Sequence, residues 1–371
     1  MRVAVVYDWL TVYAGAERVL EQILRLYPEA DLFSLIDFLP EERRGFILNK
    51  NVRTSFLQRM PWARKKYRNY LPLMPLAVER FDFSGYDLVI SASHAVAKGA
   101  RTARGQLHLC YCFTPMRYAW DLQDQYLRES NLDRGVRGAA ARMLLRYLRN
   151  WDHAGAGRVD HFVTLSRYIA ERIRNAYGRE ATVIYPPVDL DRFKVREKKE
   201  DFFLAASRMV PYKKMDLIAE AFSEMRLPLV VIGDGPDFEK VKRKAQKNVV
   251  MLGYQDDDVL RDRLERARGF VFAAEEDFGI LPVEAQACGT PVIAFGRGGA
   301  TETVVEGQTG VFFQSQTVDG LTSGINEFLE KESSFDPWII RKNAERFNRD
   351  RFIAEFKQYV DSKVETFLRN R

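Results

Sequence analysis

The chain has 371 residues, a formal net charge of +6, 46% hydrophobic residues and 29% charged residues. One hydrophobic core stops growing below this length, so the length predicts two domains. The composition excludes disordered and fibrous proteins. No apolar run reaches the roughly 20 residues that cross a bilayer. The nearest run, Leu71 to Val78, is interrupted by Pro72 and Pro75.

The N-terminus and the cysteines indicate a compartment. A strand pattern begins at Val3, which leaves no room for a signal peptide. Cys110, Cys112 and Cys288 have neither the spacing of metal ligands nor that of a disulfide framework. We therefore expect a cytoplasmic protein, with peripheral attachment to the inner face of the plasma membrane.

Apolar β-branched runs alternate with amphipathic stretches, a pattern that predicts an α/β fold with parallel sheets covered by helices. In the first half we expect strands at Val3–Tyr7, Asp31–Ile36, Leu88–Ala92, Leu107–Cys112 and His161–Leu165, and helices at Ala16–Leu26 and Ala139–Asn150. In the second half we expect strands at Phe202–Ala206, Leu229–Ile232, Val249–Leu252, Phe270–Ala274 and Val292–Phe295, and helices at Met215–Met225, Phe238–Lys247, Val259–Ala267, Val283–Cys288 and Val318–Leu329.

Two adjacent prolines mark the domain boundary. Pro186 and Pro187 fit neither a central strand nor a helix interior. We expect an N-terminal domain of residues 1–187 and a C-terminal domain of residues 188–350. The last stretch, residues 351–371, has apolar residues at helical spacing, so this helix must dock on another surface.

Basic residues gather in two segments of the first half, among aromatic and aliphatic residues. The first segment runs from Phe56 to Leu71, and the second from Arg134 to Trp151. Such mixtures attract anionic surfaces, although a solvated basic face is an equal alternative. Without a nucleic-acid-binding signature, the pattern favours a membrane and excludes nucleic acid as the partner.

The run Gly233-Asp-Gly-Pro236 lies between an expected strand and an expected helix. At this place in a doubly wound sheet, backbone N–H groups of Gly233 and Gly235 point toward a ligand at the strand ends. Glycine lets the backbone approach a phosphate. The same run also serves as an ordinary turn, so alone it is weak support.

A second loop, Glu276-Asp-Phe-Gly-Ile-Leu-Pro-Val-Glu284, leaves a strand and enters a helix that we place at Pro282. The amides of Gly279, Ile280 and Leu281 face an anion near the helix start. Glu284 lies one turn into the helix, within reach of ribose hydroxyls, and Glu276 is placed for a sugar hydroxyl. The run Asp277-Phe-Gly279 also mimics a kinase motif, but none of the other kinase motifs accompanies it.

Two cations follow the first strand of the second half, in Ser207-Arg208-Met-Val-Pro-Tyr-Lys213. A cation just past a strand end suits a diphosphate, which arginine binds in a bidentate manner and lysine as a point charge. Arg208 and Lys213 share their sheet edge with Gly233 and Glu276. This shared edge favours a binding site over a solvated surface.

These runs resemble family 4 of the retaining glycosyltransferases, which has the GT-B fold of two Rossmann-like, doubly wound domains facing an interdomain cleft. Further matching runs are Pro187-Val-Asp189, Glu284-Ala-Gln-Ala-Cys-Gly289, Gly298-Gly299 with Glu302, and Thr309-Gly310. The first half adds Ala14-Gly15-Ala16-Glu17-Arg18 and Thr114-Pro115-Met-Arg-Tyr118 with Trp120-Asp121. The latter runs resemble bacterial mannosyltransferases of O-antigen and exopolysaccharide assembly.

The resemblance implies a role for each matching residue. Arg208 and Lys213 would stabilise the departing diphosphate in place of a metal, so no metal or other cofactor is expected. Glu276 would contact the donor sugar and Glu284 the ribose, while the amides of Phe278, Gly279, Ile280 and Leu281 line the donor. Gly15 would let the N-terminal domain close on the donor. The terminal helix would pack back on that domain.

One residue departs from the family pattern. The position before Thr114 is Phe113, where the family has a histidine that contacts the donor sugar. The change implies a different donor, lost activity, or replacement by His94, which follows the strand Leu88–Ala92 at the correct sheet edge.

The sequence thus predicts a metal-independent, retaining glycosyltransferase that moves a hexose, with mannose favoured, from a nucleoside diphosphate sugar to a lipid-linked or membrane-associated glycan. A non-catalytic sugar-nucleotide-binding protein and a GT-B epimerase remain alternatives. A dinucleotide-dependent dehydrogenase is disfavoured because the complete glycine fingerprint is absent from the sequence.

Overall fold

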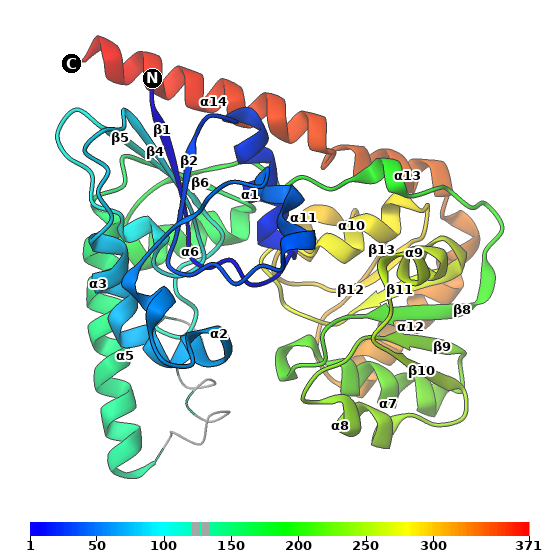
Figure 1. Ribbon diagram of the computed structural model, residues 1–371. Coiled ribbons are helices and arrows are strands. Elements are labelled where there is room, and N and C mark those ends of the chain that lie inside the picture. Colours follow the sequence, from blue (N-terminus) through cyan, green and yellow to red (C-terminus); the bar gives the residue numbers. More distant parts are fainter. Residues whose placement is uncertain (121–122, 124–126, 128–133, 371) are drawn as a thin grey trace. The chain divides into compact units, whose positions relative to one another are not determined.

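The computed structural model describes residues 1–120, 123, 127 and 134–370. The chain divides into two units, each built on one parallel sheet. The N-terminal unit comprises Met1–Pro187 with Phe352–Arg371, and the C-terminal unit comprises Val188–Arg351 (Figure 1). The chain therefore passes from one unit to the other directly after the two prolines.

The N-terminal unit has a seven-stranded sheet in the order β3-β2-β1-β4-β5-β6-β7. Its strands are β1 Val3–Tyr7, β2 Asp31–Ser34, β3 Arg53–Thr54, β4 Leu88–Ser93, β5 Leu107–Cys112, β6 His161–Thr164 and β7 Ala181–Val183. Its helices include α1 Gly15–Leu26, α2 Ala63–Lys66, α3 Met74–Glu79, α5 Gly135–Ala156, α6 Arg167–Tyr177 and most of α14 Arg349–Arg369, with 3₁₀ turns η2 Phe56–Arg59, η3 Tyr67–Leu73 and η4 Ala97–Gly99.

The C-terminal unit has a six-stranded sheet in the order β10-β9-β8-β11-β12-β13. Its strands are β8 Glu200–Ala206, β9 Leu229–Ile232, β10 Val249–Gly253, β11 Ala267–Phe272, β12 Val292–Phe295 and β13 Gly310–Phe313. Its helices are α7 Met215–Met225, α8 Phe238–Lys244, α9 Asp257–Arg266, α10 Ile280–Ala287, α11 Ala300–Thr303, α12 Val318–Lys331 and α13 Pro337–Glu345, with the 3₁₀ turn η6 Pro211–Lys213.

Both sheets follow the strand order of the Rossmann fold, in which the chain reverses direction across the sheet beside the first strand. In the N-terminal unit this switch lies between β1 and β4, and in the C-terminal unit between β8 and β11. All pairings in both sheets are parallel, so the carboxyl ends of neighbouring strands share one edge. Ligands of doubly wound sheets bind outside this edge at the switch.

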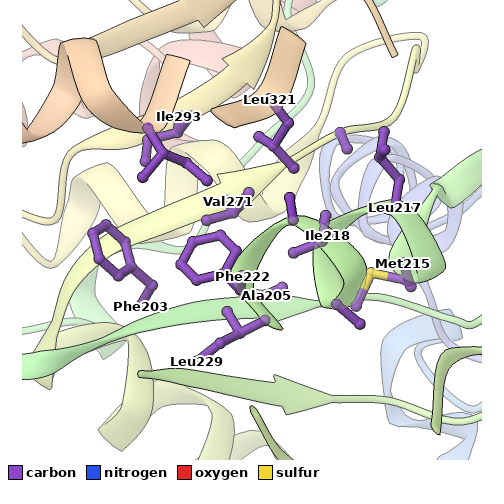
Figure 2. Close-up of a cluster of buried hydrophobic side chains, with 14 of the residues drawn as sticks. Phe203, Ala205, Met215, Leu217, Ile218, Phe222, Leu229, Val271, Ile293 and Leu321 are labelled. Carbon is purple, nitrogen blue, oxygen red and sulfur yellow. The ribbon is translucent and has the colours of Figure 1, made fainter. Parts of the chain in front are cut away.

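The core of the C-terminal unit packs α7 and α12 against one face of the sheet. Phe203 and Leu229 of the sheet and Phe222 of α7 are fully or almost fully buried, and Figure 2 shows them among neighbouring aliphatic side chains. The rings of Phe203 and Phe222 meet edge to face, with centroids 5.1 Å apart. Burial of such side chains contributes about 1.5–3 kcal/mol each, which fixes the sheet beneath its loops.

The terminal helix α14 belongs to the N-terminal unit from Phe352 onward. Its residues Phe352, Phe356 and Val360 are buried, at spacings of four that place them on one face. The ring of Tyr111 in β5 lies 6.0 Å from Phe352 and 6.2 Å from Phe356. The helix thus buries its apolar face against the sheet of the N-terminal unit.

The predicted strands in the middle of each sheet are confirmed, whereas several ends are wrong. The helix placed at Pro282 begins at Ile280, because Gly279 at φ +86° supplies its N-terminal boundary. The strand placed at Phe270–Ala274 begins and ends earlier, as β11. The short edge strands β3, β7 and β13 were missed, as were α6 and α13.

Candidate functional site

The carboxyl edge of the C-terminal sheet carries an ion pair across the switch point. The Nζ of Lys213, in η6 after β8, contacts Oε1 of Glu276, in the loop after β11. The two side chains are 16% and 19% exposed. A cation and a carboxylate that sequence analysis placed at one edge are therefore in direct contact, and water reaches both.

Arg208 lies in the same loop as Lys213 and is exposed. The loop is tied to its neighbour after β9, because the N–H of Met209 donates to the carbonyl of Asp234 at 2.9 Å. The carbonyl of Met209 in turn accepts from Asp237 at 3.1 Å. The backbone that bears both cations is thus fixed by the Gly233–Pro236 run.

Gly233 and Gly235 are required by the packing of the backbone, a role that the sequence did not indicate. At φ +136°, Gly233 passes so close to Ser207 that an added Cβ would lie 1.9 Å from its carbonyl oxygen. An added Cβ on Gly235 would lie 2.4 Å from the carbonyl oxygen of Met209. The N–H of Gly233 donates to Gly253 at 2.8 Å, so this amide is already engaged. Here glycine permits close packing of two loops.

The first turn of α10 presents backbone N–H groups at the same edge. Gly279 precedes the helix, and Ile280 and Leu281 are its first two residues. The first amides of a helix have no partner within it, and they carry partial positive charge. Phe278 is buried with its ring 5.4 Å from Phe347, which anchors the loop. The N-terminus of α10 therefore offers backbone donors at the end of the loop that carries Glu276, the partner of Lys213.

A second pair of glycines, Gly298 and Gly299, packs against the loop that carries Glu276. The N–H of Gly299 donates to the carbonyl of Glu276 at 2.8 Å. Added Cβ atoms on Gly298 and Gly299 would lie 2.5 Å from the carbonyl oxygen of Glu276 and 2.3 Å from the Cα of Phe278. The sequence marked this pair only as part of the family resemblance. Its function in the fold is to let two loops approach each other.

Glu284 lies one turn into α10, as predicted, and it is only 4% exposed. A buried carboxylate is costly unless polar groups compensate it. This burial argues against an ordinary solvated helix start. Glu284 is therefore a buried acid on the helix that begins directly after the Glu276 loop.

The N-terminal unit places His94 at the carboxyl end of β4, in the turn that leads to η4. Nδ1 of His94 lies 3.2 Å from Oδ2 of Asp8, and Asp8 directly follows β1. The ring of Phe113, which is buried, lies 6.3 Å from the His94 ring. The two side chains discussed as alternatives thus lie at the same edge. Asp8 was missed, although an acid directly after a first strand was a usable signal.

Gly15 is the first residue of α1. Its position is fixed by Glu17, whose carboxylate accepts from the N–H of Ala14 at 2.9 Å and from the hydroxyl of Tyr7 at 2.7 Å. Burial, and next the Glu17 carboxylate, raise the pKa of Tyr7 well above its ordinary value, so the phenol keeps its proton and donates. The loop before α1 is therefore anchored to β1.

The Thr114–Trp120 motif is also anchored. The guanidinium of Arg172 donates to the Thr114 hydroxyl at 2.8 Å, and the indole N–H of Trp120 donates to Asp152 at 2.9 Å. Asp121, the next residue of the motif, lies outside the described residues. In the described part of the chain, no group of three or more His, Cys, Asp or Glu side chains is arranged to hold a metal ion.

Two Rossmann-like units in one chain are the architecture of the GT-B class of fold. Solved structures agree with this class. The sucrose-phosphate synthase of Thermosynechococcus elongatus superposes with a TM-score of 0.71 at 18% identity, over 99% of this chain and all of the other. Anabaena HepE, solved in complex with UDP, gives 0.69 at 18% identity, over 98% of this chain and all of the other.

Family models identify the chain further. The model "Glycosyltransferase Family 4" matches residues 13–192, and "Glycosyl transferases group 1" matches residues 188–348. The chain belongs to family 4 of the glycosyltransferases.

One curated relative is the GDP-mannose-dependent alpha-(1-6)-phosphatidylinositol monomannoside mannosyltransferase of Mycolicibacterium smegmatis. It is 31% identical over 201 residues, covering 44% of this chain and 52% of the relative. The chain thus spans about half the length of such relatives in these matches.

Proposed function

We propose that this protein transfers a hexosyl residue from a nucleoside diphosphate sugar to a glycan acceptor, with retention of configuration and without a metal ion. The observation that carries the proposal is the Lys213–Glu276 pair beside the first turn of α10. A diphosphate brings negative charge next to Glu276, and this approach is unfavourable unless a cation offsets it. Lys213, already in contact with Glu276, is placed to do so.

In this proposal the protein's own charges replace a metal. Lys213 and Arg208 stabilise the diphosphate as the bond to the sugar breaks, and the α10 amides contribute further donors. Glu276 binds a sugar hydroxyl and Glu284 the ribose. These groups are held by packed loops, so little reorganisation is needed during the reaction. Gly15 and His94 would contact the donor from the N-terminal unit.

We propose mannose as the sugar and a lipid-linked glycan as the acceptor. The support is the M. smegmatis relative, whose name specifies GDP-mannose and a phosphatidylinositol mannoside. HepE was solved in complex with UDP, whereas the M. smegmatis relative is named for GDP-mannose. The nucleotide base of the donor is therefore a question for the assay. Transfer by purified protein should be measured with GDP-mannose and UDP-glucose in a single turnover, with and without EDTA. Transfer from GDP-mannose that survives EDTA is expected.

Other outcomes would refute parts of this proposal. Transfer abolished by EDTA and restored by magnesium would contradict the metal-independent mechanism. Conversion of the donor without any acceptor would support an epimerase. Tight donor binding with no turnover, for any acceptor, would support a non-catalytic protein.

Peripheral attachment to the cytoplasmic face of a membrane completes the proposal. No helix among the described residues is long and apolar enough to cross a bilayer. Support comes from α5, where Val136, Met143 and Tyr147 are 87%, 75% and 48% exposed. Separations of seven and four place them on one helix face. The only acid of α5, Asp152, is buried, so its exposed surface is cationic and apolar, as interfacial helices are.

The earlier basic segment adds a second surface of the same kind. Trp62, directly before α2, is 76% exposed, and Nζ of Lys66 lies 5.8 Å from the centre of its ring. Arg64 and Lys65 of α2 are also exposed. Each basic residue near an anionic surface contributes about 1 kcal/mol, so these groups favour anionic lipid.

A further inference from the structure

Asp8 is a fully buried carboxylate that organises the turn after β4. Its Oδ2 accepts from the N–H groups of His94 and Ala95, at 2.6 and 3.0 Å. Its Oδ1 accepts from Val96 and Ala97, at 2.6 and 2.7 Å. Four amide donors compensate the buried charge and fix the backbone that carries the His94 side chain.

The His94 ring is held on several sides. Its plane is nearly perpendicular to that of Trp9, at 87° with centroids 4.5 Å apart. The rings of Tyr7 and Phe113 lie 5.9 and 6.3 Å away. Nδ1 is buried and makes no hydrogen bond to the described residues, but it lies 3.2 Å from Oδ2 of Asp8, close enough for the carboxylate to attract a proton on this nitrogen. Since 27% of the side chain is exposed, it is the opposite edge of the ring, with Nε2, that faces outward.

The turn is also fixed at its far end. Lys98 is fully buried, and its Nζ lies 2.8 Å from Oδ1 of Asp152. Asp152 accepts in addition from the hydroxyl of Tyr177, at 2.6 Å, and from the Trp120 indole. The turn therefore has little freedom to reorient, and the position of the His94 ring follows from the fold.

We propose that Asp8 is a positioning residue, which holds the His94 ring with its proton on Nδ1 and so presents the Nε2 lone pair at the carboxyl edge of the N-terminal sheet. In a neutral imidazole one nitrogen carries the proton and the other accepts, and the partner of one nitrogen decides the role of the other. A carboxylate beside Nδ1 selects the Nδ1–H form. Nε2 then accepts a hydrogen bond from a sugar hydroxyl.

This inference rests on the proposed function for the identity of the ligand. It also explains how a site with Phe113 recognises a hydroxyl, because a phenylalanine ring offers no hydrogen bond. The nearby charged and titratable groups are Asp8 itself, Tyr7 with its partner Glu17, Tyr67 against Trp9, and Lys98 with Asp152. Of these, Tyr7 contacts the His94 ring edge to face, and the Asp8 carboxylate is the charged group beside the ring, 3.2 Å from Nδ1.

Nitrogen NMR of the protein labelled at histidine tests the tautomer directly. The chain has only four histidines, and the His94 signals are those lost in His94→Gln. At mildly alkaline pH, His94 should show a protonated Nδ1 and an unprotonated Nε2. A neutral ring with its proton on Nε2, or an equal mixture of the two forms, would overturn the inference. This readout needs no substrate, so it stands whether or not transfer is observed.

Two substitutions then test the role of Nε2 in transfer. His94→Gln keeps a polar group near the position of Nε2, whereas His94→Asn keeps one near Nδ1. We expect His94→Asn to lower kcat/KM by about tenfold, the cost of a lost hydrogen bond, and His94→Gln to lower it less. The exposed His153→Gln is the matched control and should be unchanged. Equal activity of His94→Asn and wild type would refute a hydroxyl contact through Nε2.

Discussion

His108 makes a quantitative prediction about stability against pH. The ring lies fully buried in β5, with Nε2 2.9 Å from the Ser91 hydroxyl. Burial lowers its pKa from 6.5 to about 4, and a backbone contact with Arg158 offsets this slightly. Between these values the unfolded chain binds a proton that the folded protein does not. The free energy of unfolding therefore rises with pH across this window and falls on acidification.

The magnitude follows from the same values. Each pKa unit corresponds to about 1.4 kcal/mol, so the fall to about 4 amounts to about 3 kcal/mol. The stability is fully present above pH 6.5 and is lost as the pH approaches about 4. Urea denaturation across this range should be compared between wild type and His108→Gln, which does not titrate. The difference in unfolding free energy between wild type and His108→Gln should change by about 3 kcal/mol between pH 6.5 and pH 4. If the unfolding free energies of wild type and His108→Gln depended on pH in the same way, the reasoning would be refuted. The variant His153→Gln changes an exposed histidine and is the control, which should follow wild type.

Other predictions concern the site and the surface. Lys213→Ala should lower kcat/KM by about 100-fold through lost charge stabilisation, while Lys242→Ala, an exposed lysine of the same unit, should not; equal activity of both would remove Lys213 from the mechanism. Glu284→Gln should weaken binding of the free nucleoside diphosphate in isothermal titration, whereas Glu276→Gln should leave it nearly intact and impair transfer; equal loss in both would contradict separate roles. Wild type, with Phe113, should transfer sugar, and activity gained only in Phe113→His would support the non-catalytic alternative. Serine at Val136, Met143 and Tyr147 should reduce sedimentation with anionic vesicles, as should glutamine at Arg64, Lys65, Lys66 and Arg68; unchanged sedimentation in both would leave these as solvated surfaces.

Elements that depend on a local pattern of apolar residues could be predicted from the sequence. Buried strands such as Val3–Tyr7 and Leu229–Ile232 are short apolar runs, and their limits were predicted correctly. The edge strand β13 is also a short apolar run, but it was missed because it directly follows the turn Gly307–Thr309. Helix α10 was placed two residues late, since proline at its third position outweighed the left-handed glycine before it.

At the site, local patterns identified the residues but not their partners. Lys213 and Glu276 were assigned to one edge, yet their direct contact depends on the crossing from β8 to β11. Asp8 is 86 residues from His94 in the chain, so only the pairing of β1 with β4 brings them together. Gly233 was attributed to a phosphate, whereas its positive φ serves contact with Ser207.

The return of α14 to the N-terminal unit sets the order in which this protein matures on the ribosome. The sheet of the N-terminal unit is complete once residues through β7 have emerged, but the contacts of Tyr111 with Phe352 and Phe356 form only after α14 has been made. During synthesis of the entire C-terminal unit, that apolar surface stays open to chaperones and to other nascent chains. Premature termination before Phe352 would release a polypeptide whose C-terminal unit can fold, whereas its N-terminal unit would keep an exposed apolar surface and tend to aggregate.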